Sequence, residues 1–147
     1  MILRKSIRTS INGRFPLIVG GHAVNLWALS YLDRIGNDLA AFQPFTSKDL
    51  DLFGTRELLD KLHEKFGGEK KLSEPRTPVI GSISVTLHGK PRTIEVLHSI
   101  CGLGGTDFED SISLLIGSLR ALVLSPQKLL KAKISNVATL DQTNRKT

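Results

Sequence analysis

Asp49 and Asp51 are two residues apart, with Leu50 and Leu52 alternating with them. Side chains at positions i and i+2 of a strand point to the same face, so a strand here would present both carboxylates together and both leucines to a core. Two adjacent negative charges repel unless a cation lies between them, and hard cations such as Mg²⁺ or Mn²⁺ take oxygen ligands. The pair therefore predicts a metal site, with an exposed, solvated strand face as the alternative.

Glu95 lies in a second alternating segment, between Ile94 and Val96. An acidic residue in such a pattern faces either solvent or a functional cleft. If its strand lies beside the strand of Asp49, three carboxylates converge, and such a group could hold metal ions and take a proton from an attacking hydroxyl. The sequence does not show whether the two strands are neighbours.

Gly20 and Gly21 follow a short apolar run and precede a helical pattern. A glycine turn at a strand-to-helix junction lets backbone amides approach a phosphate, and the helix dipole favours the bound anion. Ser47 and Lys48, just before the aspartates, could also contact phosphate. Gly-Gly also occurs in ordinary tight turns, and a lysine at a strand end is commonly only solvated, so both interpretations stay open.

The remaining chemically capable residues favour no other kind of site. The histidines lack the paired spacing that zinc sites use; they are His22, His63, His88 and His98. Cys101 is the only cysteine, which excludes an intrachain disulfide, and no histidine is an obvious partner for a nucleophilic thiol. His22 follows the glycines, where it could contact a ligand or could cap or pack the helix.

The apolar pattern supplies the elements that must position these residues. Strands are predicted at residues 15–19, 49–53, 79–87 and 92–97, with one or two more within 113–124. Helices are predicted at residues 22–35, from an N-cap at Thr55 to 66, and from Ser125-Pro126 to about 139. Residues 37–45 and 99–110 are expected to be loops, and 88–91 a hairpin connection. This order indicates an α/β or α+β fold with a small mixed sheet flanked by helices.

Length and composition favour one domain, residues 1–147. The chain is 40% hydrophobic and 23% charged, and no apolar run approaches the roughly 18 residues of a membrane span. The single cysteine and the lack of a signal-peptide pattern favour the cytoplasm. A net charge of +6 would attract a nucleotide or nucleic acid, with a mildly basic surface as an equal alternative. The polar residues 141–147, just after a helix, suggest the front part of a longer chain.

Three parts of the sequence together resemble one known superfamily. They are residues 17–25 around the glycine pair, residues 47–52 around the two aspartates, and Glu95 in its alternating segment, with residues 123–134 as a further similarity. This pattern resembles the nucleotidyltransferase superfamily, most closely its minimal and AbiEii-toxin-like branches, in which a GG-x-A helix start precedes a [ST]-x-D-x-D strand. The resemblance covers residues 15 to 137.

The resemblance implies a strand–helix–strand core of the polymerase-β type and Mg²⁺-dependent (or Mn²⁺-dependent) transfer of a nucleoside monophosphate from an NTP to an acceptor hydroxyl. The residues then expected to bind nucleotide are Gly20, Gly21, Ser47, Lys48 and Lys133 (or Lys131). Those expected to hold the metal and to act in catalysis are Asp49, Asp51 and Glu95.

Three features differ from the common pattern of that superfamily. Gly21 stands where serine is more frequent, the third carboxylate is a glutamate rather than an aspartate, and the gap from Gly21 to Asp49 is long. An insertion around residues 33–45 is therefore expected to loop out near the site.

Three hypotheses of function follow from these observations. The first is a nucleotidyltransferase, such as the toxin or substrate-modifying member of a two-gene system with an antitoxin partner. The second is a nucleotide-binding or interaction module on the same fold that lacks turnover, and the third is a basic RNA-binding protein. The acceptor is left open among tRNA, a protein side chain and a small molecule.

Overall fold

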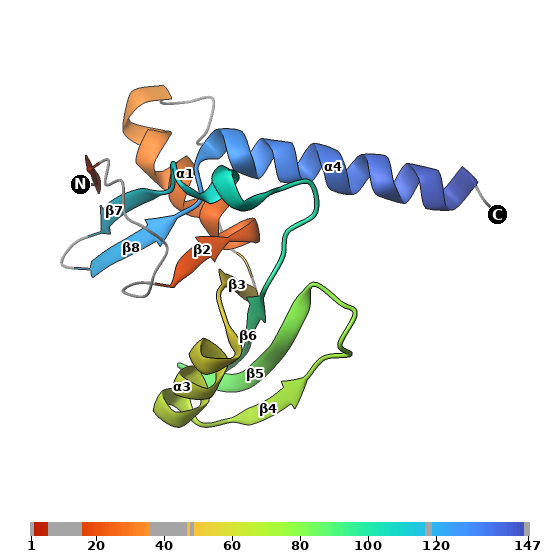
Figure 1. Ribbon diagram of the computed structural model, residues 1–147. Helices are drawn as coiled ribbons and strands as arrows, with labels where there is room; N and C mark the ends of the chain where they lie inside the picture. The colour runs from red at the N-terminus through yellow and green to blue at the C-terminus, as the bar shows by residue number, and fades with distance from the viewer. Residues whose placement is uncertain (1, 6–15, 36–46, 48, 117–118, 146–147) are drawn as a thin grey trace.

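The computed structural model describes residues 2–5, 16–35, 47, 49–116 and 119–145 (Figure 1). The expected loop at residues 37–45 and the insertion that it would contain lie outside the described residues, apart from positions 33–35. The elements in chain order are β1 (Ile2–Lys5), β2 (Leu17–Val19), α1 (Gly20–Ile35), β3 (Asp49–Phe53), α3 (Arg56–Phe66), β4 (Glu69–Leu72), β5 (Val79–Leu87), β6 (Lys90–Leu97), η1 (Gly105–Phe108), β7 (Ile112–Ile116), β8 (Leu119–Val123) and α4 (Pro126–Arg145). The fold is α+β, as expected.

The described strands form one mixed sheet of eight, in the order β1-β7-β8-β2-β3-β6-β5-β4. Two pairs are parallel, β2 with β8 and β3 with β6, and the other neighbours are antiparallel. The parallel pairing of β3 with β6 requires a long crossover, which α3, β4 and β5 supply. The central strands β2, β3 and β6 are therefore joined by pairing between distant parts of the sequence.

The strand register separates the two faces of the sheet. Ile18 pairs with Leu52, and Leu52 pairs with Val96, so these three side chains share one face. Ile18 packs in the cluster of α1, and Val96 packs in the cluster of α3, which places both helices over this face. The opposite face carries Val19 and Asp51, which are also paired.

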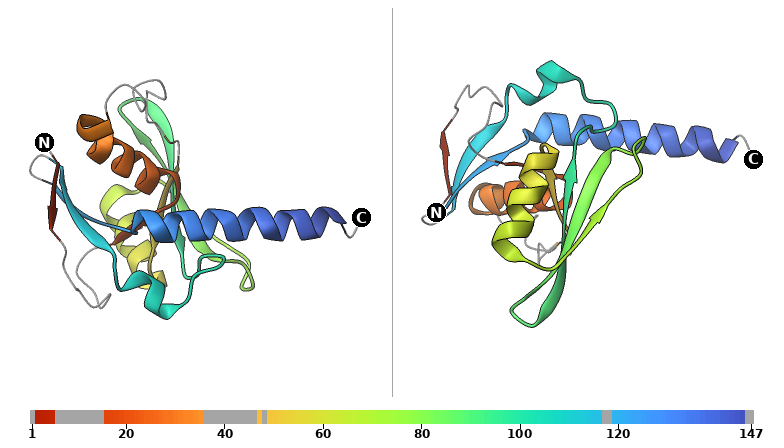
Figure 2. Two further views of the ribbon diagram at one scale, coloured as in Figure 1. Left: turned by 90° about the horizontal axis from the view of Figure 1, so that it is seen from above. Right: turned by 60° about the horizontal axis from the view of Figure 1, so that its bottom comes forward.

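Two apolar clusters hold α1 and α4 to the β2–β8 half of the sheet. Ala23 and Trp27 of α1 are buried against Val123 of β8. The indole Nε1–H of Trp27 donates to the carbonyl oxygen of Leu124 at 2.8 Å, and the ring is only 4% exposed. This bond ties α1 to a residue two positions before the start of α4. The more distant part of α4 extends away from the sheet toward the C-terminus (Figure 2).

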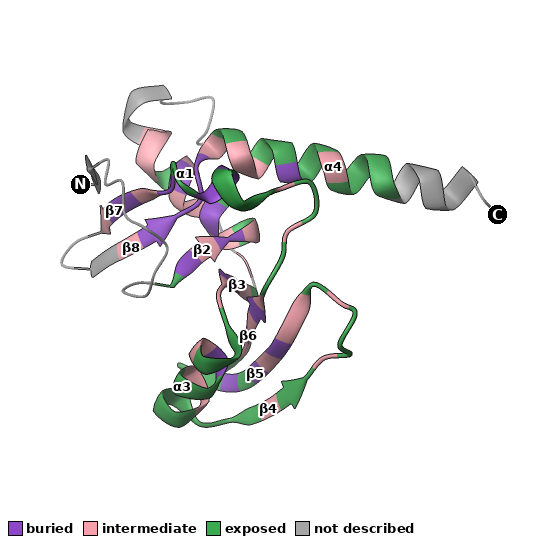
Figure 3. Cartoon of the chain, in the orientation of Figure 1, coloured by how far each residue is buried: buried purple, intermediate pink, exposed green. Residues whose placement is uncertain are grey.

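A third cluster joins α3 to the other half of the sheet (Figure 3). Leu59 is fully buried against Ile83 and Val96 because the apolar side chains of α3 recur on one face of the helix. Thr55 caps the helix by accepting a hydrogen bond from the Leu58 amide at 3.4 Å, as its position predicted. Gly67 ends the helix with φ of 68°.

Some boundaries differ from the sequence predictions. Helix α1 begins at Gly20 rather than at His22, so the glycine pair forms its first turn. The hairpin connection contains two residues rather than four, because His88 and Gly89 both adopt positive φ, 51° and 73°, and β6 already begins at Lys90. Helix α4 continues to Arg145.

Two edge strands and a short helix were not predicted. Strand β1 pairs with β7, and strand β4 pairs with β5, at opposite edges of the sheet. The charged sequence of β4, Glu-Lys-Lys-Leu, has no strand-like alternation, so its pairing with β5 determines its conformation. Residues 105–108, expected to be irregular, form the 3₁₀ helix η1. None of the helices that the structure describes is long and apolar enough to cross a membrane.

Candidate functional site

Strands β3 and β6 bring two of the candidate carboxylates together. Asp51 pairs directly with Glu95 in the parallel register, so both side chains leave the sheet on the same face. Asp49 lies two residues before Asp51 and projects to that face as well, at the exposed start of β3. The sequence leaves open whether the strands of Asp49 and Glu95 are neighbours, and in the fold they are.

The neighbouring carboxylates affect the pKa of Asp51. Partial burial, followed by the negative charges of Glu95 and Asp49, raises the pKa of the Asp51 carboxyl from 3.8 to about 6. The nearby His22 side chain has the opposite, smaller effect on this pKa. Burial and, after it, the neighbouring negative charges therefore both disfavour the ionised form of Asp51.

The three carboxylates are ligands of a type that binds hard divalent cations. Carboxylate oxygens are the ligands that Mg²⁺ and Mn²⁺ prefer, and a cation would relieve the repulsion that raises the pKa of Asp51. Among the described side chains, no three His, Cys, Asp or Glu residues are grouped closely enough to form a ready metal cage. Asp49 and Glu95 therefore flank Asp51 on the sheet face without enclosing a common point.

The glycine turn lies directly against Asp51. Gly20 adopts φ of 65°, and a Cβ atom at this position would overlap the Oδ2 atom of Asp51. A Cβ atom at Gly21 would lie 3.1 Å from the Oγ atom of Ser47. Both glycines thus allow the first turn of α1 to approach the start of β3, and for Gly20 the backbone conformation itself favours glycine.

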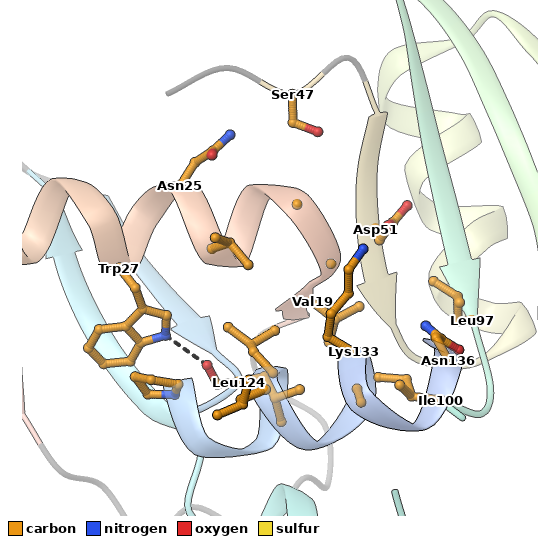
Figure 4. A pocket seen from close by; sticks show the side chains of 17 residues that line it. Val19, Asn25, Trp27, Ser47, Asp51, Leu97, Ile100, Leu124, Lys133 and Asn136 are labelled. Carbon is orange, nitrogen blue, oxygen red and sulfur yellow. Dashed lines mark hydrogen bonds between the residues drawn. The ribbon is translucent and has the colours of Figure 1, made fainter. Parts of the chain in front are cut away.

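A cavity of about 710 Å³ opens beside this turn, between α1 and α4 (Figure 4). Its lining includes the Gly20-Gly21 backbone and the polar side chains of Asn25, Ser47, Asp51, Lys133 and Asn136. Its apolar lining residues include Val19, Val24, Trp27, Leu97, Ile100, Leu124, Leu129 and Leu130. Of the three candidate carboxylates, Asp51 lines the cavity, and Asp49 and Glu95 are its neighbours on the sheet. The cavity thus has the volume and the mixed lining that small-molecule sites require.

The lysine candidates have different environments. Lys133 of α4 is exposed and lines the cavity, where it carries the one positive charge among the described lining residues. In Figure 4 its side chain extends toward the end of the cavity that Asp51 occupies. Lys131 instead forms an ion pair with Asp107 at 2.9 Å. Lys48 lies outside the described residues.

Asp107 anchors α4 to the 3₁₀ helix η1. Its carboxylate accepts hydrogen bonds from the Gly104 amide at 2.8 Å and from Lys131 and Lys128 at 2.9 and 3.0 Å. The Gly104 bond, followed by the two lysines, holds the pKa of this carboxyl well below its usual range. Asp107 itself is only 7% exposed, whereas the side chain of Lys131 is half exposed. The anchor orients the helix that carries Lys133.

Sequence reasoning missed several of these residues. Asn136 lies three positions after Lys133 in α4, a spacing that places both on one helix face, so the position of Lys133 could have indicated it. Asn25 and Asp107 gave no comparable signal, because their roles depend on contacts between elements. Among the histidines, His63 and His98 bond to the carbonyl oxygens of Gly68 and Thr77.

Comparison with known protein families, curated proteins and solved structures found no match to this chain.

Proposed function

We propose that the protein is a nucleotidyltransferase that uses Mg²⁺ or Mn²⁺ to transfer a nucleoside monophosphate from an NTP to an acceptor hydroxyl. One observation carries the proposal: Asp51 and Glu95 are paired on neighbouring strands, and Asp51 lines a cavity that also contains the Gly20-Gly21 turn. Carboxylates beside an anion-binding helix start supply the two kinds of contact that a metal-bound triphosphate needs.

Each residue has a defined role in this proposal. The amides of Gly20 and Gly21 would bind phosphate oxygens, assisted by the dipole of α1. Lys133 would contact the same phosphates from α4. Asp49, Asp51 and Glu95 would hold the divalent cation, which supplies charge stabilisation at the transferring phosphorus when bound. In the structure the Ser47 hydroxyl donates to the Asp49 carbonyl oxygen at 3.1 Å, and when nucleotide binds it would turn to a phosphate oxygen, in place of the hydroxyl that Gly21 lacks.

The transfer itself requires one proton acceptor and one leaving group. The hydroxyl oxygen of the acceptor would attack the α-phosphorus of the NTP, and the bond from that phosphorus to the bridging oxygen of pyrophosphate would break. The hydroxyl proton would pass to the Glu95 carboxylate, and pyrophosphate would leave. Holding both reactants in the cavity would provide much of the rate enhancement.

The sequence resemblance to the minimal and AbiEii-toxin-like nucleotidyltransferases supports this reaction class. On that basis, we propose a cytoplasmic protein of a toxin–antitoxin system, with an antitoxin protein as its partner. The acceptor would be tRNA, a protein side chain or a small molecule bearing a hydroxyl. The alternative hypothesis, a nucleotide- or RNA-binding module without turnover, predicts nucleotide or RNA binding but no release of pyrophosphate.

Calorimetric titration with a non-hydrolysable NTP analogue tests the binding part of the proposal. Wild-type protein should bind the analogue more tightly with Mg²⁺ than without it. Asp51→Asn should weaken the Mg²⁺-dependent binding by at least about tenfold, because a charged ligand is lost. Glu64→Gln removes an exposed carboxylate of α3 and serves as the matched control. Equal affinity with and without Mg²⁺, or no effect of Asp51→Asn, would contradict the proposed site.

A further inference from the structure

Among the residues that the structure describes, none is a strand partner for the Asp49 carbonyl oxygen on the β2 side. Strand β2 ends at Val19, and Val19 pairs with Asp51, so β2 provides no residue opposite Asp49. Backbone groups of residues i and i+2 in a strand point to the same side, so the Asp49 carbonyl faces the place where β2 has ended. A carbonyl in this position needs a donor from elsewhere in the chain.

Two side chains donate to this carbonyl oxygen. The Nδ1–H group of His22, in the first turn of α1, donates to it at 2.7 Å. The hydroxyl of Ser47 donates to it at 3.1 Å. The two bonds hold the Asp49 peptide from two directions, because one donor comes from α1 and the other from the segment just before β3. We name these contacts the His22–Ser47 clamp.

The clamp links the first turn of α1 to strand β3, the two elements that carry the candidate site. His22 directly follows Gly20 and Gly21, so its bond ties the turn proposed to bind phosphate to the strand that carries both aspartates. A fixed Asp49 peptide plane fixes the direction in which the Asp49 side chain leaves the strand. The imidazole also lies near enough to Asp51 to lower the pKa of that carboxyl.

We propose that His22 is a positioning residue: its Nδ1–H group holds the Asp49 peptide so that Asp49 and Asp51 can bind one metal–nucleotide complex. The inference rests on the proposed function and adds to it the residue that sets the geometry of the carboxylate pair. His22 acts through Asp49, because its Nδ1–H group donates to the Asp49 carbonyl oxygen.

Two conservative substitutions separate this role from simple packing. The side-chain nitrogen of asparagine is the same number of bonds from Cβ as Nδ1 of histidine, whereas that of glutamine corresponds to Nε2. His22→Asn should therefore keep the donor to Asp49, and His22→Gln should lose it. Both variants remove the ring, so a pure packing role would weaken both variants alike.

The measurement is Mg²⁺-dependent binding of the NTP analogue by each variant, with thermal unfolding of the metal-free proteins as the test of folding. His22→Asn should bind within about threefold of wild type, and His22→Gln should bind about tenfold more weakly. In an Asp49→Asn background, His22→Gln should cause little further loss, since His22 acts through Asp49. Ser47→Ala should cause a smaller loss than His22→Gln, because its bond is longer.

The outcomes distinguish failure of this inference from failure of the proposed function. If wild-type protein shows no Mg²⁺-dependent nucleotide binding, the proposed function is wrong, and the positioning role is wrong with it. If wild type binds, but His22→Asn and His22→Gln lose equal affinity or none, only the positioning role is overturned. Additive losses from His22→Gln and Asp49→Asn would also overturn it.

Discussion

At the scale of single residues, Asp51 is a site residue whose ionised form lowers the stability of the folded protein. Its carboxyl has a pKa of about 6 in the folded chain and 3.8 as the ordinary value, so the folded state binds this proton more tightly than the unfolded state. The group therefore stabilises the fold most below about pH 3.8, and this contribution is lost as the pH rises through about 6. A fold that holds an unfavourable charge at neutral pH commonly does so at a functional site.

Asp51→Asn should stabilise the metal-free protein near neutral pH. The amide carries no charge, so the free energy of unfolding at about pH 7.5 should rise by about 1 kcal/mol, a value reduced for partial exposure to solvent. Near pH 4 the wild-type carboxyl is largely protonated in the folded state, so the two proteins should then differ little. Urea unfolding at both pH values measures this, and equal destabilisation at both would contradict it.

Gly20→Ala should affect both stability and ligand binding. A side chain at this position meets positive φ and also the Asp51 carboxylate. The first effect costs about 1 kcal/mol, and displacement of Asp51 should add to it and weaken Mg²⁺-dependent nucleotide binding. Gly67→Ala is the matched control, because Gly67 has φ of 68° but no described atom lies within 4 Å of the position that a Cβ would take.

The comparison is useful because the two glycines have similar positive φ angles, 65° and 68°. Gly67→Ala should reduce stability and leave nucleotide affinity unchanged. If both variants bound the nucleotide equally well, the close approach of Gly20 to Asp51 would have no functional role.

At the scale of elements, the sheet and helices near the site differ in how readily the sequence predicts them. Strands β3 and β5 have the predicted bounds, because their alternation or apolar content is strong over five or more residues. The pairing of β3 with β6 could not be predicted, since it depends on the path of α3, β4 and β5 between them. The sequence therefore predicts that Asp51 and Glu95 are close only if their strands are neighbours.

The anchor between η1 and α4 was also beyond prediction from the sequence. Asp107 and Lys131 lie far apart in the chain, and neither residue type indicates a partner at that distance. The glycine-rich composition of residues 99–110 favoured an irregular segment, but hydrogen bonds to the Asp107 side chain order it. Local pattern thus predicted the elements that carry the site, and tertiary contacts determine how they are oriented.

Asp107→Asn should destabilise the protein through α4. The neutral amide would lose the charge that binds Lys128 and Lys131, so the thermal unfolding midpoint at neutral pH should fall clearly further than in Glu64→Gln. Because the pKa of Asp107 is lowered in the folded state, its stabilising effect is present above the ordinary value of 3.8 and is lost at more acidic pH. The difference between the variant and wild type should therefore shrink in strong acid, and a constant difference would contradict this account.

At the scale of the whole molecule, the cavity is where distant parts of the chain meet. Its walls come from α1, from the central strands and from α4. Among the described lining residues, Lys133 is the one positively charged side chain, and it lies at the end near Asp51. The positive charge of Lys133 and the carboxylate of Asp51 in one cavity would favour a ligand that carries both phosphate and metal. The net charge of the chain, +6, agrees with an anionic ligand but does not identify it.

Lys133→Met and Lys131→Met should separate ligand binding from anchoring. Lys133 lines the cavity, so its replacement should weaken nucleotide binding by about tenfold and reduce the dependence of affinity on salt. Lys131 is paired with Asp107, so its replacement should lower thermal stability with little effect on affinity. Calorimetry at low and high salt provides the measurement, and a reversed pattern would show that Lys131 is the phosphate-binding lysine.

The most direct test of the central claim is a crystal structure with Mn²⁺ and a non-hydrolysable NTP analogue, recorded so that manganese gives an anomalous signal. The account predicts a manganese peak within about 2.3 Å of carboxylate oxygens of Asp49 and Asp51, with Glu95 beside it and the triphosphate on the Gly20-Gly21 turn. A manganese or nucleotide position away from these residues would contradict the account.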